Sequence, residues 1–336
     1  MKVFEKLGVA VVGTGYFGRF HARVFKELPE VYLCGVFDTD IKRAETVARE
    51  IGSRTYREFE ELLDDRNVEA VNLCVSDQAH REPATNICRA GKHLLVEKPL
   101  ATTIEDCDAI IEAADKAGVK LMVGHILRYD PRYRIAREKV IEGEIGDIIQ
   151  FYARRSNPII AARRLGDRCG KYTVIYHNAV HDLDQMLWTL PGDKIKASAF
   201  SREGLLQSEG IGVSDAVVTI LKFENEAVGL MENCWALPEE HPMLIDAVFE
   251  ITGIRGKIII DARQQGLAVF KHHGGFEYTD TMYWPEFKGR VGGALKEELS
   301  DFVRCGIWDH NAECGRPLIL PLPYQQLLLS HHSPQS

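Results

Sequence analysis

Residues 7–18 read LGVAVVGTGYFG, an apolar, valine-rich run that passes directly into three closely spaced glycines. The run is typical of a buried strand. Gly13, Gly15 and Gly18 form the pattern GxGxxG, and the residues from Gly18 to Glu27 have the periodicity of an amphipathic helix. A strand, a glycine-rich turn and a helix in this order predict the start of a doubly wound α/β domain.

The same alternation continues to about residue 125. The strand candidates are YLCGVFD, AVNLCV, HLLVEKP and LMVGH, and the helix candidates are residues 41–51, 59–63, 79–90 and 104–117. Strands that are apolar on both faces and separated by helices indicate a parallel sheet that is covered on both sides. We therefore expect residues 1–125 to form one α/β domain.

Longer strand candidates dominate the second half of the chain. They are residues 148–155, 195–202, 215–223, 227–235, 246–252, 257–261 and 267–272, with helix candidates at 132–142 and 173–189. This pattern predicts an α+β domain over residues 126–336, in which one or two helices cover a single face of a mainly antiparallel sheet. An open sheet face of this kind favours association with a partner.

The composition excludes several classes of protein. The 336 residues hold 41 Lys and Arg against 49 Asp and Glu, and the net charge of −8 disfavours a nucleic-acid or anionic-membrane partner. No apolar run reaches the roughly 18 residues of a membrane span, so we expect a cytoplasmic protein. Eight cysteines without a CxxC pair are more typical of buried thiols than of a disulfide framework or a zinc ribbon.

The glycine-rich turn indicates a dinucleotide site. Its glycines permit a tight turn and a close approach of the backbone to a pyrophosphate, which the helix N-terminus favours. Asp38 ends the next strand, twenty residues after Gly18, where a carboxylate accepts hydrogen bonds from ribose hydroxyls and repels a 2′-phosphate. NAD is therefore favoured over NADP. The expected cofactor-binding residues are Gly13, Thr14, Gly15, Tyr16, Phe17, Gly18 and Asp38.

A second cluster, Glu97-Lys98-Pro99, ends an apolar strand candidate. Ligands of open α/β sheets bind outside the carboxyl ends of the strands, so the cluster is expected at the mouth of the cofactor site. Lys98 would donate a hydrogen bond to a reacting oxygen and stabilise its negative charge, while Glu97 would hold Lys98 in place.

The third cluster is HNAVHDLD, residues 177–184, within the helix candidate of the second half. His177 and His181 are four residues apart and share one helical face, and the near-neutral pKa of histidine suits transfer of a hydroxyl proton. A metal site is an alternative, although a zinc protease would have Glu at Asn178. A histidine pair that only packs is a second alternative.

Together these clusters resemble the Gfo/Idh/MocA oxidoreductases. The resemblance rests on GxGxxG at 13–18, on His80 followed by AGKHLLVEKPLA, and on the helix with His181-Asp182, and it covers about residues 7–310. It implies an N-terminal Rossmann domain, a C-terminal domain with an open-faced sheet, a nicotinamide cofactor, and homodimers or homotetramers formed through that sheet.

The resemblance also implies roles for single residues. Lys98 corresponds to the catalytic lysine of the EKP motif and His181 to the catalytic histidine, while Ser76 and His80 fall in a loop that lies beside the cofactor in relatives. The chain departs from the family at His177, which stands where relatives have aspartate. It also departs in the tail from Pro317, which lacks the amphipathic closing helix usual there.

Further candidates flank the expected substrate cleft. His125 and Arg128 stand just past the last strand of the first domain and are expected to reach substrate, with packing at the junction as the alternative. A basic stretch precedes the histidine helix and would grip a phosphate or carboxylate, unless it is a solvated loop. It comprises Arg154, Arg155, Arg163, Arg164, Arg168 and Lys171.

The function that these residues predict is an NAD-dependent dehydrogenase that oxidises a secondary hydroxyl of a sugar, a cyclitol or a nucleotide-sugar. The first alternative is an NAD-assisted glycosidase, which the family also contains. A non-catalytic NAD-sensing regulator is a second alternative, and the presence of both Lys98 and His181 argues against it.

Overall fold

The computed structural model of the protein describes residues 6–166, 173–190, 195–273 and 276–308. These residues form two compact units, the first from 6–129 together with 282–308 and the second from residues between 130 and 281. The predicted domain boundary at residue 125 lies close to the first division. The structure differs from the prediction at residues 282–308, which rejoin the first unit although the sequence analysis places them in the second domain.

The first unit is built on a five-stranded parallel sheet in the order β2-β1-β3-β4-β5. Its strands are β1 (Leu7–Val12), β2 (Val31–Phe37), β3 (Ala70–Leu73), β4 (His93–Glu97) and β5 (Leu121–Gly124). All residues of β1, β3 and β5 are buried. The runs that are apolar on both faces therefore form buried strands of a parallel sheet, as predicted.

Helices connect these strands and cover the sheet. They are α1 (Tyr16–Glu27), α2 (Ile41–Ile51), α3 (Phe59–Asp64), α4 (Arg81–Arg89) and α5 (Ile104–Ala117), with short 3₁₀ turns η1 (Asp77–Ala79) and η2 (Ile126–Tyr129). Local signals set the ends of α5: the Thr103 side chain accepts a hydrogen bond from the Asp106 N–H, and Gly118 closes the helix with φ of 66°.

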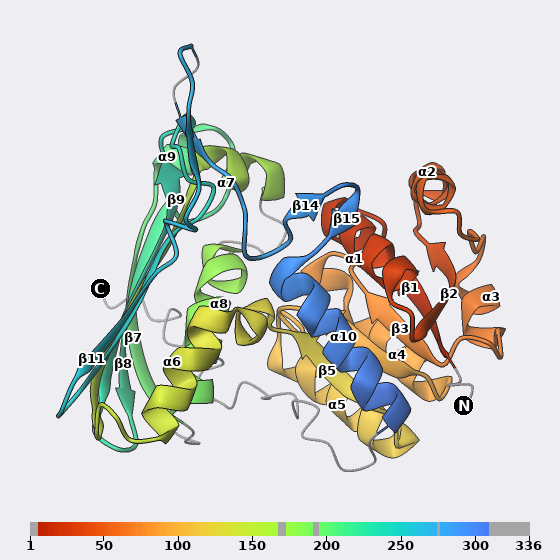
Figure 1. The fold of residues 1–336 in the computed structure, drawn as a ribbon, viewed down its shortest axis with the longest axis horizontal. Helices are drawn as coiled ribbons and strands as arrows, with labels where there is room; N and C mark the ends of the chain where they lie inside the picture. The colour runs from red at the N-terminus through yellow and green to blue at the C-terminus, as the bar shows by residue number, and fades with distance from the viewer. Residues whose placement is uncertain (1–5, 167–172, 191–194, 274–275, 309–336) are drawn as a thin grey trace. The chain divides into compact units, whose positions relative to one another are not determined.

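Residues 282–308 return to this unit through a two-stranded hairpin and a last helix. The elements are β14 (Glu286–Phe287), β15 (Arg290–Val291) and α10 (Gly293–Trp308). Helix α10 lies beside α1 and also contacts β1 and η2 (Figure 1).

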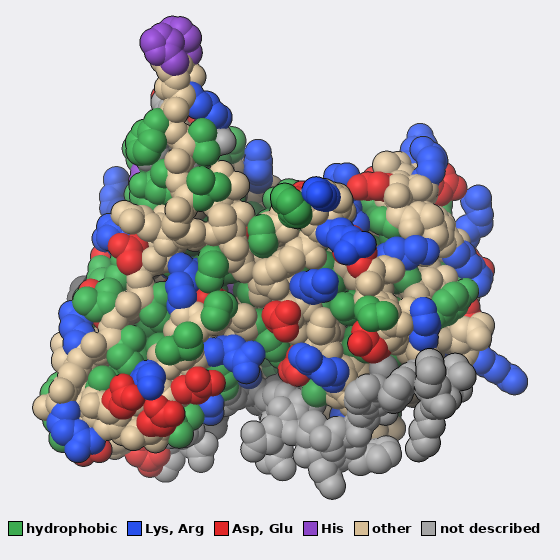
Figure 2. Space-filling model, in the orientation of Figure 1, with side chains coloured by type: hydrophobic (Ala, Val, Ile, Leu, Met, Phe, Trp, Pro, Cys, Tyr) green, Lys and Arg blue, Asp and Glu red, His purple; other side chains and the backbone are tan. Residues whose placement is uncertain are grey.

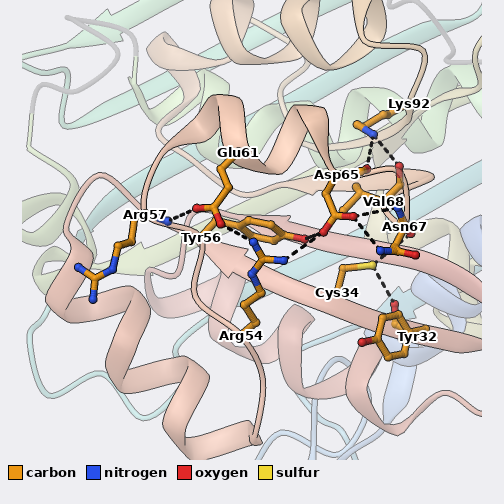
Figure 3. A network of polar contacts seen from close by, with 10 residues as sticks. All are labelled: Tyr32, Cys34, Arg54, Tyr56, Arg57, Glu61, Asp65, Asn67, Val68 and Lys92. Atoms are coloured by element: carbon orange, nitrogen blue, oxygen red, sulfur yellow. Dashed lines mark hydrogen bonds and ion pairs between the residues drawn. The ribbon is translucent and has the colours of Figure 1, made fainter.

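A polar network braces the segments that lead into β3 and β4 (Figure 3). Lys92 is buried and donates to the backbone carbonyls of Asp65 and Val68, at 3.0 and 2.7 Å. Asp65 in turn accepts from the Tyr56 hydroxyl at 2.8 Å and from Arg54 at 3.2 Å. Because these residues precede their strands, the network stabilises the amino ends and leaves the carboxyl ends of the sheet to other contacts.

The second unit contains a six-stranded sheet in the order β11-β10-β6-β9-β8-β7. Its strands are β6 (Ile148–Pro158), β7 (Ile195–Arg202), β8 (Ala216–Phe223), β9 (Val228–Leu237), β10 (Asp246–Gly253) and β11 (Lys257–Asp261). Neighbours are antiparallel except β6 and β9, which are parallel. A separate hairpin pairs β12 (Ala268–Phe270) with β13 (Phe276–Tyr278).

The second unit also contains α6 (Pro131–Ile141), α7 (Ile159–Leu165), a π-helical turn η4 (Ile175–Ala179) that continues into α8 (Val180–Thr189), and α9 (Leu205–Ser208). Helices α6 and α8 lie on the same side of the sheet (Figure 1). In β8 the residues alternate between buried and exposed, with Val218 and Ile220 at 40% and 52% exposure. One face of the sheet is therefore core and the other is open, which confirms the predicted fold class.

Other expectations concern residues that are only partly described. Cys34, Cys74, Cys88, Cys107, Cys234 and Cys305 are free thiols, while Cys169, Cys314 and the tail from Pro317 lie outside the described residues. Burial raises the pKa of the Cys34 thiol to about 12. None of the helices in the described part of the chain is long and apolar enough to cross a membrane.

Candidate functional site

The candidate residues of the first unit meet at one edge of its sheet. Val12 is in register with Phe37 and Leu73, and Glu97 with Gly124, so the chain leaves β2, β1, β4 and β5 on the same side. Asp38, Gly13, Lys98 and His125 are the residues that follow these strand ends. The strand order reverses between β1 and β3, which is where open α/β sheets bind their ligands.

In the glycine-rich turn between β1 and α1, neighbouring backbone segments approach each other closely. Gly13 has φ of +88°, and a Cβ there would lie 2.5 Å from the Cys74 carbonyl oxygen. A Cβ on Gly18 would lie 1.9 Å from the Gly13 oxygen, so these two glycines are required by the turn itself. At Gly15 no neighbouring atom lies within 4 Å of the Cβ position.

Gly15 is also the N-cap of α1, which has neither a capping side chain nor an acidic residue in its first turn. No side chain therefore caps the first backbone N–H groups at the positive end of this helix dipole. Helix N-termini of this kind attract anions such as a pyrophosphate. Tyr16 at the start of the helix is 72% exposed, and Phe17 packs edge-on against Trp284 at 5.1 Å between ring centroids.

Asp38 is fixed against the tip of this turn. Its Oδ2 accepts hydrogen bonds from the Thr14 N–H at 2.7 Å and the Thr14 hydroxyl at 3.0 Å, and its Oδ1 accepts from the Asp40 N–H at 2.9 Å. Arg43 lies 3.8 Å from Oδ2 and also pairs with Asp40. The carboxylate is thus held beside the glycine-rich turn, with the Arg43 guanidinium close to it.

The loop after β3 contributes one exposed and one buried candidate. Ser76 is exposed at the start of η1. His80 is fully buried, with Nδ1 against the carbonyl oxygens of Pro99 and Leu100 at 3.0 and 3.2 Å and Nε2 against that of Val75 at 3.2 Å. Its contacts favour support of the turn after Lys98 over the direct cofactor contact that the sequence analysis expected.

Glu97 and Lys98 occupy the end of β4. Glu97 is the last strand residue and is partly buried, and its Oε2 accepts from the Lys98 N–H at 3.2 Å. The Lys98–Pro99 peptide is cis. His125 follows β5 and is buried, while Arg128 in η2 is partly exposed and its N–H donates to the His125 carbonyl at 3.0 Å.

The histidine helix of the second unit contains a local irregularity. Residues 175–179 form a π-helical turn, so His177 is not one ordinary α-turn from His181 as the sequence analysis assumed. His177 and His181 are nevertheless both partly exposed, and all other residues between 173 and 187 are buried. The His177 ring lies 6.4 Å from the Trp235 ring. The two histidines are therefore the partly exposed residues of an otherwise buried stretch, and Nδ1 of His181 is itself buried.

The residue after His181 anchors this helix. Asp182 accepts two hydrogen bonds from Arg155 on β6, at 3.0 and 2.8 Å, and both side chains are buried. Burial raises the pKa of Asp182, and the adjacent guanidinium opposes this shift. Arg155 also donates to the Tyr133 hydroxyl at 3.3 Å. The pair fixes α8 to the sheet at the position next to His181.

This arrangement corrects the expectation of a basic loop. Arg154 and Arg155 belong to β6, and Arg154 donates to Asp246 at 2.9 Å. Arg163 on α7 pairs with Glu209 and Glu239 at 2.8 and 2.7 Å. Arg168 and Lys171 lie outside the described residues. Three of the arginines are therefore neutralised by carboxylates of their own unit, which lowers their capacity to bind an anionic substrate.

Two further observations bear on the chemistry. Within the described residues, no three or more His, Cys, Asp and Glu side chains gather in a way that would hold a metal ion. His21 and Asn72 were not singled out from the sequence: His21 contacts Asn72 through Nδ1 and Glu97, the last residue of β4, through Nε2. The sequence signal that could have identified His21 is the presence of a polar histidine on the buried face of α1.

Comparison with known proteins agrees with both halves of the chain. A family model described as GFO_IDH_MocA, an oxidoreductase family with an NAD-binding Rossmann fold, matches residues 7–125. A model for the GFO/IDH/MocA C-terminal domain matches residues 133–259.

Individual relatives extend the match along most of the chain. Myo-inositol 2-dehydrogenase of Thermotoga maritima is 26% identical over 317 residues, which cover 92% of this chain and 89% of the relative. The 2,7-anhydro-N-acetylneuraminate hydratase of Mediterraneibacter gnavus is 26% identical over 265 residues, 76% of this chain and 68% of the relative.

A solved structure shares the fold. Scyllo-inositol dehydrogenase from Lactobacillus casei, with bound cofactor NAD(H) and scyllo-inositol, has a TM-score of 0.80 and 18% identity, and the alignment covers 97% of each chain. The two domain matches, in the order that the fold requires, establish that this chain belongs to the Gfo/Idh/MocA family of oxidoreductases, with an NAD-binding Rossmann domain at residues 7–125.

Proposed function

We propose that the protein is an NAD-dependent dehydrogenase that oxidises a secondary hydroxyl of a cyclitol or sugar, with nucleotide-sugars as a further possible class. The observation that carries the proposal is the edge of the first sheet, where the glycine-rich turn, Asp38, Glu97-Lys98 and His125 follow four strand ends. A dinucleotide-binding turn and a lysine at the same edge suit a reaction in which hydride leaves a carbon that carries an oxygen.

In the proposed chemistry, two side chains act on the substrate hydroxyl, one on its oxygen and one on its proton. NAD supplies the hydride acceptor when bound. Lys98 donates a hydrogen bond to the substrate oxygen and stabilises the negative charge that develops as the C–H bond breaks. His181 accepts the hydroxyl proton, for which a partly exposed imidazole is suited. We assign His125, Arg128 and His177 to substrate binding.

The substrate class rests on the relatives. Myo-inositol 2-dehydrogenase from Thermotoga maritima matches along most of this chain, and the Lactobacillus casei structure that shares its fold holds scyllo-inositol. The arginines before the histidine helix point the same way, because Arg155 and Arg163 are paired with carboxylates of their own unit. Basic and acidic side chains are also interspersed on the face of the molecule in Figure 2. Paired arginines suit an uncharged polyol better than a polyanion.

The test is a screen of myo- and scyllo-inositol, other polyols, aldoses, sugar acids and UDP-sugars, each with NAD and with NADP. We expect one polyol or sugar to cause net accumulation of NADH. If no member of the panel reduces either cofactor, while the protein binds NADH, the proposal of a dehydrogenase fails.

A second candidate is a redox-neutral reaction, in which transient oxidation eases elimination and water addition. The similarity to 2,7-anhydro-N-acetylneuraminate hydratase is the specific observation that favours it. Such an enzyme, whether a hydratase or an NAD-assisted glycosidase, would convert its substrate without a steady-state rise in NADH. Product analysis by chromatography in the same screen separates it from the dehydrogenase.

We also propose that the protein forms homodimers or homotetramers through the open face of the second sheet. Val218 and Ile220 on β8, Val228 on β9 and Phe200 on β7 are exposed apolar side chains of that sheet. Light scattering after size exclusion should give two or four subunits, and Ile220→Glu should lower that number. A wild-type monomer at micromolar concentration would contradict the proposal.

A further inference from the structure

His21 is a fully buried histidine that touches two strands of the first sheet. It lies on α1, a little more than one turn after the glycine-rich turn ends. Its Nδ1 lies 2.9 Å from Asn72 Oδ1 on β3, and its Nε2 lies 3.2 Å from Glu97 Oε1 on β4. One ring therefore joins the cofactor-binding helix to the strand that ends at Lys98.

The contacts of Asn72 decide which ring nitrogen donates. The Asn72 side-chain nitrogen donates to the Leu95 carbonyl oxygen at 3.4 Å, because a carbonyl oxygen can only accept. The Asn72 side-chain oxygen therefore faces His21. That oxygen also accepts from the Cys74 thiol at 3.2 Å, and burial keeps the pKa of this thiol well above its usual value. Asn72 Oδ1 is thus an acceptor, and Nδ1 of His21 carries a proton.

The second ring nitrogen faces a carboxylate. Nε2 is buried, and Glu97 Oε1 lies 3.2 Å from it. The ring is therefore held by Asn72 on one side and meets the carboxylate of Glu97 on the other.

Close neighbours surround the ring and the carboxylate. Phe17 presents an edge-type contact at 4.9 Å between ring centroids. The other titratable groups nearby are the Cys74 thiol and Glu298 on α10, which helps to raise the pKa of that thiol, and Lys98 itself follows Glu97. Around Glu97 the space is close-fitting, since a Cβ on Gly124 would lie 3.0 Å from its Oε1.

We propose that His21 is a positioning residue for Lys98 that acts through Glu97, an inference that rests on the proposed function of Lys98. The ring contacts Oε1 at 3.2 Å, while Oε2 accepts the Lys98 N–H at 3.2 Å. Without the ring, the carboxylate can turn away from the Lys98 N–H, and Lys98 is then held less firmly at the substrate oxygen on which negative charge develops.

A double-mutant cycle tests whether His21 acts through Glu97. We expect His21→Gln and Glu97→Gln each to lower kcat by about tenfold or more, and the double variant to be no slower than the worse single variant within about twofold. NADH affinity of His21→Gln should stay within about twofold of wild type. Losses that multiply in the double variant, or a fall in NADH affinity that accounts for the whole effect, would overturn the proposal.

His93→Gln is the matched control. His93 is the first residue of β4, and its Nδ1 accepts from the Lys120 N–H at 3.1 Å, at the end of the strand opposite to Glu97. We expect its kcat to equal that of wild type under the assay conditions. A loss as large as that of His21→Gln would mean that any histidine change in this sheet slows turnover.

A second readout needs no substrate. In crystal structures of the variants, we expect the Glu97 carboxylate of His21→Gln to leave the Lys98 N–H, whereas His93→Gln should keep this contact. An unmoved Glu97 carboxylate in His21→Gln refutes the positioning role. If the carboxylate moves but no polyol is oxidised by the wild type, the proposed function fails and the positioning role stands.

Discussion

The carboxylate of Asp182 accepts two hydrogen bonds from the guanidinium of Arg155, at 3.0 and 2.8 Å, in a part of the second unit where both side chains are buried. The two residues are 27 positions apart and join α8 to β6. Because Asp182 directly follows His181, the pair sets both the stability of the helix and the direction of the proposed proton acceptor.

Arg155→Met should strongly destabilise the second unit. It leaves the Asp182 carboxylate buried without a cation, which costs about 3 to 5 kcal/mol in the free energy of unfolding. The double change Arg155→Met with Asp182→Leu should recover most of that loss, because no buried charge remains. Urea unfolding followed by fluorescence measures both.

The control for this prediction is Arg163→Met, which removes two ion pairs that are open to solvent. We expect a much smaller loss of stability, because solvent screens such pairs. Equal losses in the free energy of unfolding for the two arginine substitutions would show that the buried pair contributes no more to stability than the solvent-exposed pairs.

Cofactor preference should depend on Asp38. We expect NAD to bind at least about tenfold more tightly than NADP, a difference of about 1.4 kcal/mol. Asp38→Asn should reduce the difference in affinity between NAD and NADP, because the amide no longer repels a 2′-phosphate. The amide oxygen can still accept a hydrogen bond from Thr14. Asp40→Asn, which changes the other partner of Arg43, should keep the preference. Equal affinities of the wild type in a fluorescence titration would contradict the assignment.

Lys98→Met should remove turnover while leaving the cofactor bound. Loss of a positioned donor at a reacting oxygen typically costs about 100-fold or more in rate. NADH affinity should change little, since we assign Lys98 to the substrate oxygen. Lys116→Met is the control, because Lys116 is exposed on α5 and pairs only locally with Glu112. Near-normal kcat in Lys98→Met would refute the catalytic assignment.

Most of the first unit could be predicted because its signals are local. An apolar run followed by glycines or charges indicates where a strand ends, so the places of Asp38 and Lys98 just after β2 and β4 were predicted, while their roles stay predictions. The ends of α5 were predicted exactly, because Gly118 at φ of 66° is a local C-terminal signal.

The residues that sequence reasoning missed depend on distant partners. Arg155 belongs to an arginine-rich stretch that was interpreted as an anion-binding basic loop, with a solvated loop as the alternative, and its buried pair with Asp182 could not be predicted. The contacts of His21 are with Asn72 and Glu97, which are 51 and 76 residues away in the sequence and could not be paired with it in advance. The π-helical turn that contains His177 has no sequence signature comparable to a glycine cap.

Stability should fall below neutral pH because of His93. Burial lowers the pKa of His93 from 6.5, and Lys120 adds to this effect while Glu69 opposes it. Below pH 6.5 the unfolded chain therefore binds a proton that the native protein resists, so the free energy of unfolding decreases as the pH falls.

His93→Gln removes this titration. We expect the variant to lose less stability than wild type between about pH 8 and about pH 5, measured by urea unfolding at each pH. Parallel losses in the two proteins would assign the acid sensitivity to other groups.

His177 is the position where the chain departs from its family, and three roles can be separated there. If it relays the proton or binds substrate, His177→Ala should lower kcat/KM clearly but less than His181→Ala, because His181 is proposed to contact the hydroxyl directly. If it shares a metal with His181, both variants should lose bound zinc and a chelator should inactivate the wild type.

We favour relay or binding, since both histidines are partly exposed on a helix that is otherwise buried between residues 173 and 187. His272→Ala, at an exposed position after β12, should leave activity unchanged and serves as the control. Full activity of His177→Ala with an unchanged pH profile would leave packing near Trp235 as its role.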